Sequence, residues 1–251
     1  KELRDEALAK GMVTISFNKI ENKSSYENLN VVIESKIKSS LNNLRNPFVK
    51  VIDVQNTNQL IKEQQRGLDQ GSDIQVGKIL VAKAIFSGSL MTFVINEGKL
   101  LKQDKRGFLK EEYIVKDPTT GEPKKHYKYN KVTYTEYKQE NRITSSFQYQ
   151  LISTESSAIL VSDAMDINAF DGIHFVIFEG NGSHLVPGYW EFIDKDKPQD
   201  KVDESPASVE NLRGLLKSDR NIKSIESLKS EILDGISTRV AKKINLYNPE
   251  D

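Results

Sequence analysis

Three histidines, His126, His174 and His184, are the side chains of this sequence best suited to proton transfer or metal binding. None lies in a catalytic pattern, because no serine occupies a GxSxG elbow and the chain contains no cysteine. His174 stands in the apolar run GIHFVIFEGN, where a half-buried histidine with a hydrogen-bond partner is expected. The alternative is an enzyme with an unfamiliar site at His174 and Glu179, but five residues along one strand place these side chains on opposite faces.

Metal and phosphate sites are not predicted either. His184 and His174 have no carboxylate at a ligand spacing, and the DxDxDG calcium pattern is absent. The glycine-rich turn Gly180–Ser183 follows a strand, but the next residues, HLVPGYW, are not typical of a helix that would cradle a phosphate. We therefore expect a protein that is not an enzyme and that needs no cofactor.

The charge balance disfavours nucleic acid as a partner. The chain has 251 residues, with 36 basic and 36 acidic side chains and no formal net charge. The run KKHYKYNK at Lys124–Lys131 interleaves basic and aromatic residues, as single-strand binders do, but an exposed strand explains it better in a neutral chain. No stretch approaches the roughly 20 apolar residues of a membrane helix.

The first residues, KELRDEALAKGM, are charged and do not read as a signal peptide. Because the chain starts with lysine, we expect a trimmed mature form, from which a signal segment or a lipid-bearing cysteine has been removed. Absence of cysteine excludes disulfides and thiolate metal sites but assigns no compartment.

Periodicity predicts the first half of the fold. Alternating apolar residues predict a strand over 11–20, and apolar residues at spacings of three and four predict a helix over 26–44. The buried face of that helix comprises Leu29, Ile33, Ile37, Leu41 and Leu44. Further elements are a strand over 48–54, helices over 57–66 and 72–82, and a strand over 84–95 whose Gly88 indicates a bulge or a close backbone approach.

The region from Asn96 to Asn141 is rich in lysine, glutamate and tyrosine, with the turn signal DPTTGEP. It predicts an inserted polar β-hairpin over 101–140, with arms near 108–116 and 126–138. Tyrosine is enriched at protein interfaces, so the hairpin tyrosines are candidate contacts; ordinary cross-strand tyrosine pairs are the alternative. These candidates are Tyr113, Tyr127, Tyr129, Tyr134 and Tyr137.

The remaining residues predict strands over 146–152, 158–167, 172–181 and 184–193, followed by a charged linker over 194–206. Pro206 opens a short helix, and an amphipathic helix closes the chain from about Ile225 to Tyr247. The element order predicts an α/β protein, a single domain over 1–251, with a βαβ crossover and a mixed, mainly antiparallel sheet packed by helices.

The stretch from Asn56 to Leu90 resembles the central signature of the CsgG-like family. In that family a helix ends in Glu-Gln, the next helix carries a glycine near its middle, and the following strand ends in Gly-Ser. The matching positions are Glu63–Gln64, Gly77–Lys78 and Gly88–Ser89, whereas VAKA at Val81–Ala84 replaces the family's Gly-Ala-Asp.

The resemblance implies a CsgG-like, anticodon-binding-domain-like fold and a bacterial cell-envelope protein, often a lipoprotein. Such proteins serve in secretion, assembly or as scaffolds, through protein partners and self-association, in the periplasm and tethered to the outer membrane. A curli-type pore is not expected, because both faces of the second hairpin arm carry charged residues, which are costly in the bilayer. A periplasmic protein that binds a small ligand in a deep apolar pocket remains a further alternative.

Overall fold

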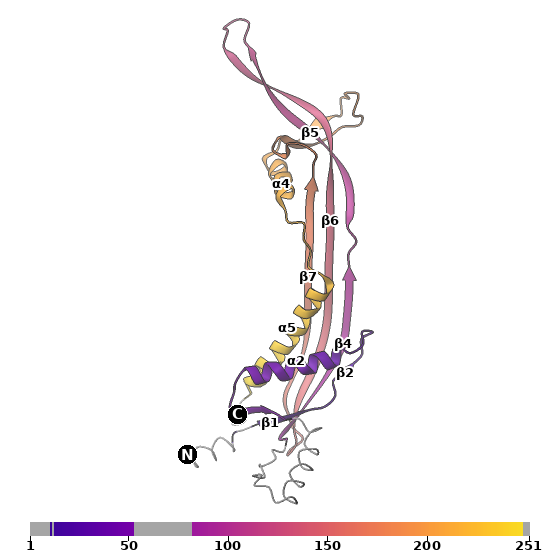
Figure 1. Cartoon of the computed structure of the whole chain (residues 1–251), viewed down its shortest axis with the longest axis vertical. Coiled ribbons are helices and arrows are strands. Elements are labelled where there is room, and N and C mark those ends of the chain that lie inside the picture. The colour runs from indigo at the N-terminus through magenta and orange to yellow at the C-terminus, as the bar shows by residue number, and fades with distance from the viewer. Residues whose placement is uncertain (1–10, 12, 53–81, 248–251) are drawn as a thin grey trace, which may run out of the picture. The chain divides into compact units, whose positions relative to one another are not determined.

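The computed structural model describes residues 11, 13–52 and 82–247, which are the coloured residues of Figure 1. They belong to two compact units. Of the described residues, the first unit comprises 11, 13–52, 82–96, 142–169 and 225–247, and the second comprises 97–141 and 170–224. Positions Glu63–Gln64 and Gly77–Lys78 lie outside the described residues, as do the helices predicted there. The single domain over 1–251 remains a prediction.

The sheet of the first unit is built around a parallel crossover, as the sequence predicts. Strand β1 (Val13–Phe17) lies parallel to both β3 (Val49–Val51) and β4 (Ala84–Glu97). The two-residue strand β2 (Glu21–Asn22) adds to β4 at Ser89–Leu90, also in parallel. Strand β4 is hydrogen-bonded to β6 (Pro123–Ser153), and β6 also pairs with β7 (Ile159–Ile177).

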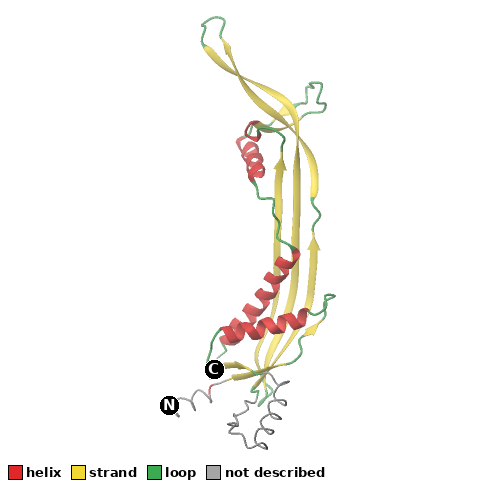
Figure 2. Ribbon diagram, in the orientation of Figure 1, coloured by secondary structure: helices red, strands yellow, loops and turns green. Residues whose placement is uncertain are grey.

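Two helices, α2 (Leu29–Asn43) and α5 (Ile225–Asn245), bury their apolar stripes against one face of this sheet (Figure 2). Alternate residues of β6 complete the core, among them Phe147 and Leu151. The predicted buried face of α2 is confirmed except at Leu44, which is 44% exposed because the helix ends one residue earlier.

The second unit is an antiparallel sheet with one helix. Strand β5 (Leu101–Lys116) pairs with β6 from Leu101↔Lys138 to Lys116↔Pro123, and the predicted turn joins them. Helix α4 (Pro206–Lys217) packs through Leu212 against the strands. Three short elements lie between β7 and α4 in the chain. The short elements are the 3-10 turn η1 (Gly182–His184), β8 (Leu185–Tyr189) on β5, and β9 (Lys201–Val202) on β8.

These elements confirm an α/β architecture with a mixed, mainly antiparallel sheet packed by helices. Two predicted strand breaks are wrong. The hairpin arm at 126–138 and the strand at 146–152 belong to the single strand β6. The strands at 158–167 and 172–181 belong to β7, which ends at Ile177, so residues 178–181 are not strand as predicted. The polar residues between them are strand positions rather than loops, because no turn-forming Pro-Gly or Asn-Gly pair interrupts either run. Asn141 and Ser145 among them are buried and donate to the carbonyl oxygens of Lys223 and Thr92.

The segment 194–206, predicted as a charged linker, carries more structure than expected. It contains β9, and two of its side chains, Asp200 and Glu204, form ion pairs with Lys131 of β6 and Lys110 of β5. The segment therefore packs on the second unit before α4 begins. No helix within residues 11, 13–52 and 82–247 is long and apolar enough to cross a membrane.

Candidate functional site

The β5–β6 hairpin ends in a two-stranded ribbon, residues 110–128, which we call the hairpin end. Strand β8 pairs with β5 only as far as Leu109↔Leu185, so beyond this point β5 and β6 pair with each other alone (Figure 1). Oδ1 of Asp117 caps the turn by accepting the N–H of Thr119 at 2.8 Å. Gly121 adopts a φ of 71°, which glycine tolerates best. The turn chemistry therefore fixes the register of the ribbon.

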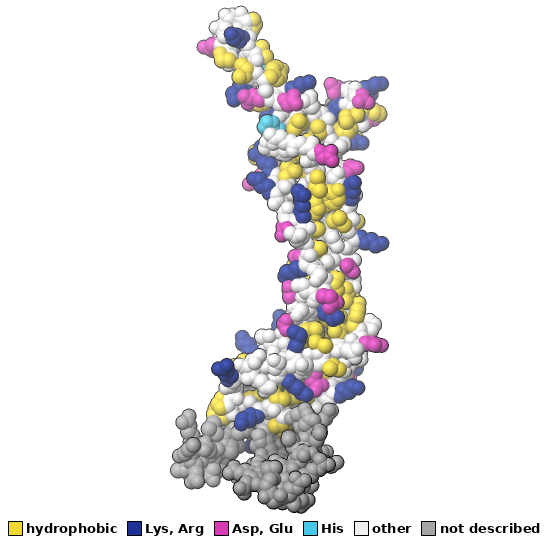
Figure 3. Space-filling view, viewed as in Figure 1, with side chains coloured by type: hydrophobic (Ala, Val, Ile, Leu, Met, Phe, Trp, Pro, Cys, Tyr) yellow, Lys and Arg dark blue, Asp and Glu magenta, His cyan; other side chains and the backbone are white. Residues whose placement is uncertain are grey.

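Apolar side chains are exposed on both faces of the hairpin end. Tyr113, Ile114 and Val115 on β5 are 48%, 65% and 43% exposed, and Tyr127 on β6 is 46% exposed. In Figure 3 yellow hydrophobic side chains lie beside dark-blue basic ones on this ribbon. Consecutive strand residues point to opposite faces, so the three adjacent apolar residues of β5 leave neither face of the ribbon purely polar.

The five candidate tyrosines do not form one surface. Tyr113 and Tyr127 are exposed at the hairpin end, and Tyr129 is half-buried near its base. Tyr134 packs in the apolar cluster around Leu212, and Tyr137 stacks on Phe175 with ring centroids 4.9 Å apart. Tyr134 and Tyr137 therefore serve packing inside the second unit.

The alternative was that these tyrosines form ordinary cross-strand tyrosine pairs. The register of β5 and β6 places no tyrosine directly opposite another tyrosine. Every one of the five stands opposite a residue of another type. The opposing pairs are Tyr113↔His126, Glu112↔Tyr127, Lys110↔Tyr129, Lys105↔Tyr134 and Lys102↔Tyr137. Among these five opposing pairs, only Tyr113 faces an aromatic ring, that of His126, at a centroid distance of 5.6 Å.

Lys110 fixes the base of the hairpin end. Its Nζ lies 2.6 Å from Oε1 of Glu204 and 4.1 Å from the ring centroid of Tyr127. The hydrogen bond with Glu204 raises the pKa of Lys110, and burial raises the pKa of Tyr129. Both groups keep their protons at neutral pH, so the cation remains over the Tyr127 ring.

His174 has a carboxylate partner, but not the one considered from sequence. Its Nε2 lies 2.5 Å from Oε1 of Glu136, whose Oε2 lies 3.1 Å from Nζ of Lys105. Burial opposes ionisation of Glu136, but hydrogen bonds with His174 and Lys105 outweigh it and lower its pKa. The pairing joins residues 38 positions apart on β6 and β7, so no local pattern in the sequence marks it.

The other two histidines take no part in this pairing. His126 stacks on Tyr113, and His184 ends the 3-10 turn η1. Within the described part of the chain, no group of three or more His, Cys, Asp or Glu side chains is placed to hold a metal ion.

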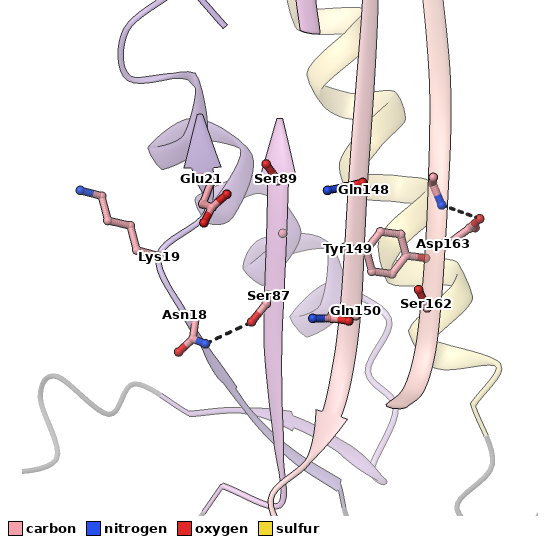
Figure 4. Close-up of a pocket in the computed structure, with 12 residues that line it drawn as sticks. Asn18, Lys19, Glu21, Ser87, Ser89, Gln148, Tyr149, Gln150, Ser162 and Asp163 are labelled. Atoms are coloured by element: carbon pink, nitrogen blue, oxygen red, sulfur yellow. Dashed lines mark hydrogen bonds between the residues drawn. The ribbon is translucent and has the colours of Figure 1, made fainter. Parts of the chain in front are cut away.

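Sequence reasoning missed a polar groove in the first unit, which we call the sheet groove (Figure 4). It has a volume of about 500 Å³ and takes its lining from β2, β4, β6, β7 and the segment between β1 and β2. Alternating Ser87–Ser89 and Gln148–Gln150 pairs mark it in the sequence, as polar positions opposite a buried strand face.

Comparisons with known proteins assign this chain to no family. No family model matches it, and no curated protein matches it. Among solved structures, the PelC dodecamer from Paraburkholderia phytofirmans is 12% identical, with 63% of this chain and 74% of that chain covered and a TM-score of 0.29. Lipoprotein GNA1162 from Neisseria meningitidis is 11% identical over 63% of this chain and 83% of that chain, at a TM-score of 0.30. A neuraminyllactose-binding hemagglutinin homolog from Helicobacter pylori is 11% identical over 94% and 84%, at a TM-score of 0.36.

Proposed function

We propose that this chain is a non-enzymatic binding module that contacts a protein partner, or a second copy of itself, through the hairpin end. The observation that carries the proposal is the exposure of Tyr113, Ile114 and Tyr127 on a two-stranded ribbon. A two-stranded hairpin alone is at best marginally stable in water, so a covering partner would stabilise this ribbon. Tyrosines at its surface suit an interface, because their rings contribute area and their hydroxyls still reach water.

The ribbon also offers backbone groups for pairing. At the hairpin end β5 and β6 each pair on one side only, so each strand has an outer edge. An extended segment of a partner could add to such an edge by main-chain hydrogen bonds, with the alternate side chains giving specificity. Lysines along the edge, among them Lys116, Lys124 and Lys128, disfavour indiscriminate pairing of edges.

The setting we propose is the bacterial cell envelope, in assembly, export or scaffolding. In this proposal the protein works in the periplasm, and a lipid anchor outside this chain tethers it to the outer membrane. The support is the sequence resemblance to the CsgG-like family around Gly88–Ser89, together with the parallel β1–α2–β3 crossover. A membrane fractionation of cells that express the whole gene would test this setting, and recovery in the cytosol would contradict it.

The interface can be tested without disturbing the fold. Deletion of 101–140 would remove Phe108, which is buried, and Lys131, so its failure to bind would be uninformative. The sharper variant is Y113S/I114S/Y127S. We expect it to lose self-association in light scattering, or partner adducts in cells, while the fluorescence of Trp190 stays unchanged.

A photo-crosslinking amino acid placed at position 113 or 127 should give discrete protein adducts in cells. The matched control is position 246, where Leu246 is 69% exposed in the first unit. Adducts of equal yield from 246, or unchanged association of the triple-serine variant, would contradict the hairpin interface.

A further inference from the structure

The sheet groove lies on the face of the first-unit sheet that α2 and α5 leave open. In Figure 4 these helices lie behind the strands, and Gln148 and Gln150 extend from β6 in front of them. Their neighbours on β6, Phe147 and Leu151, point into the core beneath the helices, which places the glutamines on the opposite face. The groove is therefore a feature of the solvent face of three adjacent strands, β4, β6 and β7.

Hydroxyl and amide groups dominate its lining. Ser87 and Ser89 lie two residues apart on β4, as do Gln148 and Gln150 on β6, so each pair shares one face with a spacing of about 7 Å. Asn18 extends the row and donates from Nδ2 to Oγ of Ser87 at 3.1 Å. Adjacent strands lie about 4.8 Å apart, so the groove presents a plate of uncharged polar groups.

One of these groups has no partner within the described residues. The hydroxyl of Ser89 is buried and neither donates nor accepts a hydrogen bond there, and Ser89 is only 6% exposed. Buried polar groups are nearly always paired, so this hydroxyl on the groove face indicates that something else completes it. The unpaired hydroxyl of Tyr149 belongs to the opposite face, because the Tyr149 ring packs in the core on Phe86 and Phe147.

We propose that the sheet groove binds a neutral, hydroxyl-rich ligand, of the chemical class of an uncharged oligosaccharide. Each ligand hydroxyl both donates and accepts, and so do the amides of Gln148 and Gln150 and the serine hydroxyls. The volume of about 500 Å³ lies within the range of about 300–1,000 Å³ of small-molecule sites.

The charged side chains of the lining favour an uncharged oligosaccharide over a charged ligand. Lys19 and Glu21 carry opposite charges, and Asp163 already accepts the N–H of Ala164 at 2.9 Å. An anionic polymer would meet two carboxylates and one ammonium. An apolar ligand would leave the glutamine amides desolvated and unpaired, which costs free energy.

The test is saturation-transfer NMR and calorimetry on the full chain. The probes are cellohexaose, maltohexaose and N-acetylchitohexaose, beside an anionic oligogalacturonate and a neutral Gly-Ser peptide. We expect transfer from the protein to at least one of the three neutral saccharides, and an affinity weakened about tenfold or more in Q148A/Q150A, because a pair of amide hydrogen bonds is lost.

Two controls make the outcome decisive. Gln103→Ala removes an exposed glutamine from β5, outside the groove, and should leave binding unchanged. Circular dichroism should show the same fold for Q148A/Q150A as for the parent, since both glutamines lie on the open face. No signal from the neutral saccharides, binding of the oligogalacturonate or the peptide alone, or equal affinity in Q148A/Q150A would each overturn the proposal. The hairpin end plays no part in this test. Failure of the saccharide-binding proposal would therefore not affect the hairpin-interface proposal, and the reverse also holds.

Discussion

Nζ of Lys131 lies 2.6 Å from Oδ2 of Asp200, and the two side chains are only 7% and 11% exposed. The same ammonium lies 2.9 Å from Oδ1 of Asp196 and donates to the carbonyl oxygens of Phe192 and Lys195 at 3.0 and 2.7 Å. One lysine on β6 therefore satisfies its three N–H donors with oxygens of the segment between β8 and β9. That segment is held in place while it presents Phe192 to solvent.

Lys131→Met should destabilise the second unit, because Asp200 would keep its charge in an enclosed site without a counter-ion. We expect the melting temperature followed by Trp190 fluorescence to fall by about 5–10 °C. Trp190 is a suitable reporter, since its buried Nε1 donates to the carbonyl oxygen of Gly107 at 3.0 Å in the same unit. The control is Lys128→Met on the exposed hairpin end. An equal shift for both variants would contradict the role of the ion pair.

The same pair makes stability depend on pH. The hydrogen bond from Lys131, against the opposing effect of burial, lowers the pKa of Asp200 below its ordinary value of 3.8. A carboxyl whose pKa is lowered by folding stabilises the native state above that ordinary value. The contribution is lost as the pH falls through the lowered folded-state pKa.

The urea midpoint of the parent, followed by Trp190, should therefore fall more steeply than that of Lys131→Met when the pH is lowered from about 5 to about 2. Parallel pH profiles for the two proteins would show that Asp200 is not the group responsible.

Local periodicity predicted the helices and strands whose side chains are buried at regular intervals. It could not predict side-chain pairs whose two residues are distant in the chain. The stripe of α2 from Leu29 to Leu41 was identified because the helix buries one face throughout. The pairs Lys131–Asp200 and Glu136–His174 join residues 69 and 38 positions apart. The register of β6 and β7 brings the second pair together, and the path of the segment between β8 and β9 brings the first. The sheet groove was missed because serine and glutamine on an open strand face also read as ordinary solvated positions.

Gly88→Ala should destabilise the first unit, which follows from the close approach predicted at this residue. A Cβ there would lie 2.8 Å from Cζ of Phe147 and 3.3 Å from Cε1 of Phe86, and both rings are fully enclosed. We expect a loss of about 1–3 kcal/mol in the free energy of unfolding, measured by urea and circular dichroism.

Gly88→Ala should cost less free energy of unfolding in the F147L background than in the parent. The reason is that the smaller leucine side chain leaves room for the new methyl group. Gly214→Ala is the opposite control. No atom lies within 4 Å of a Cβ at this position in α4, so alanine should stabilise the helix by about 0.4–1 kcal/mol. A neutral effect of Gly88→Ala would show that the contact with Phe147 relaxes freely.

Ile236→Ala tests whether residues 1–251 unfold as the single predicted domain. Ile236 is fully buried on α5, and its truncation should cost about 2–5 kcal/mol through lost burial and the cavity that remains. Trp190, the only tryptophan, belongs to the second unit, whereas α5 belongs to the first. If the chain unfolds cooperatively, circular dichroism and Trp190 fluorescence should give the same lowered urea midpoint.

Leu246→Ala, at a position that is 69% exposed, should change the free energy of unfolding by no more than about 0.5 kcal/mol. The single-domain prediction is wrong if Ile236→Ala moves the circular dichroism transition and leaves the Trp190 transition where it stands in the parent. The two units would then be separate folding units, since a loss of core packing in one would not reach the other.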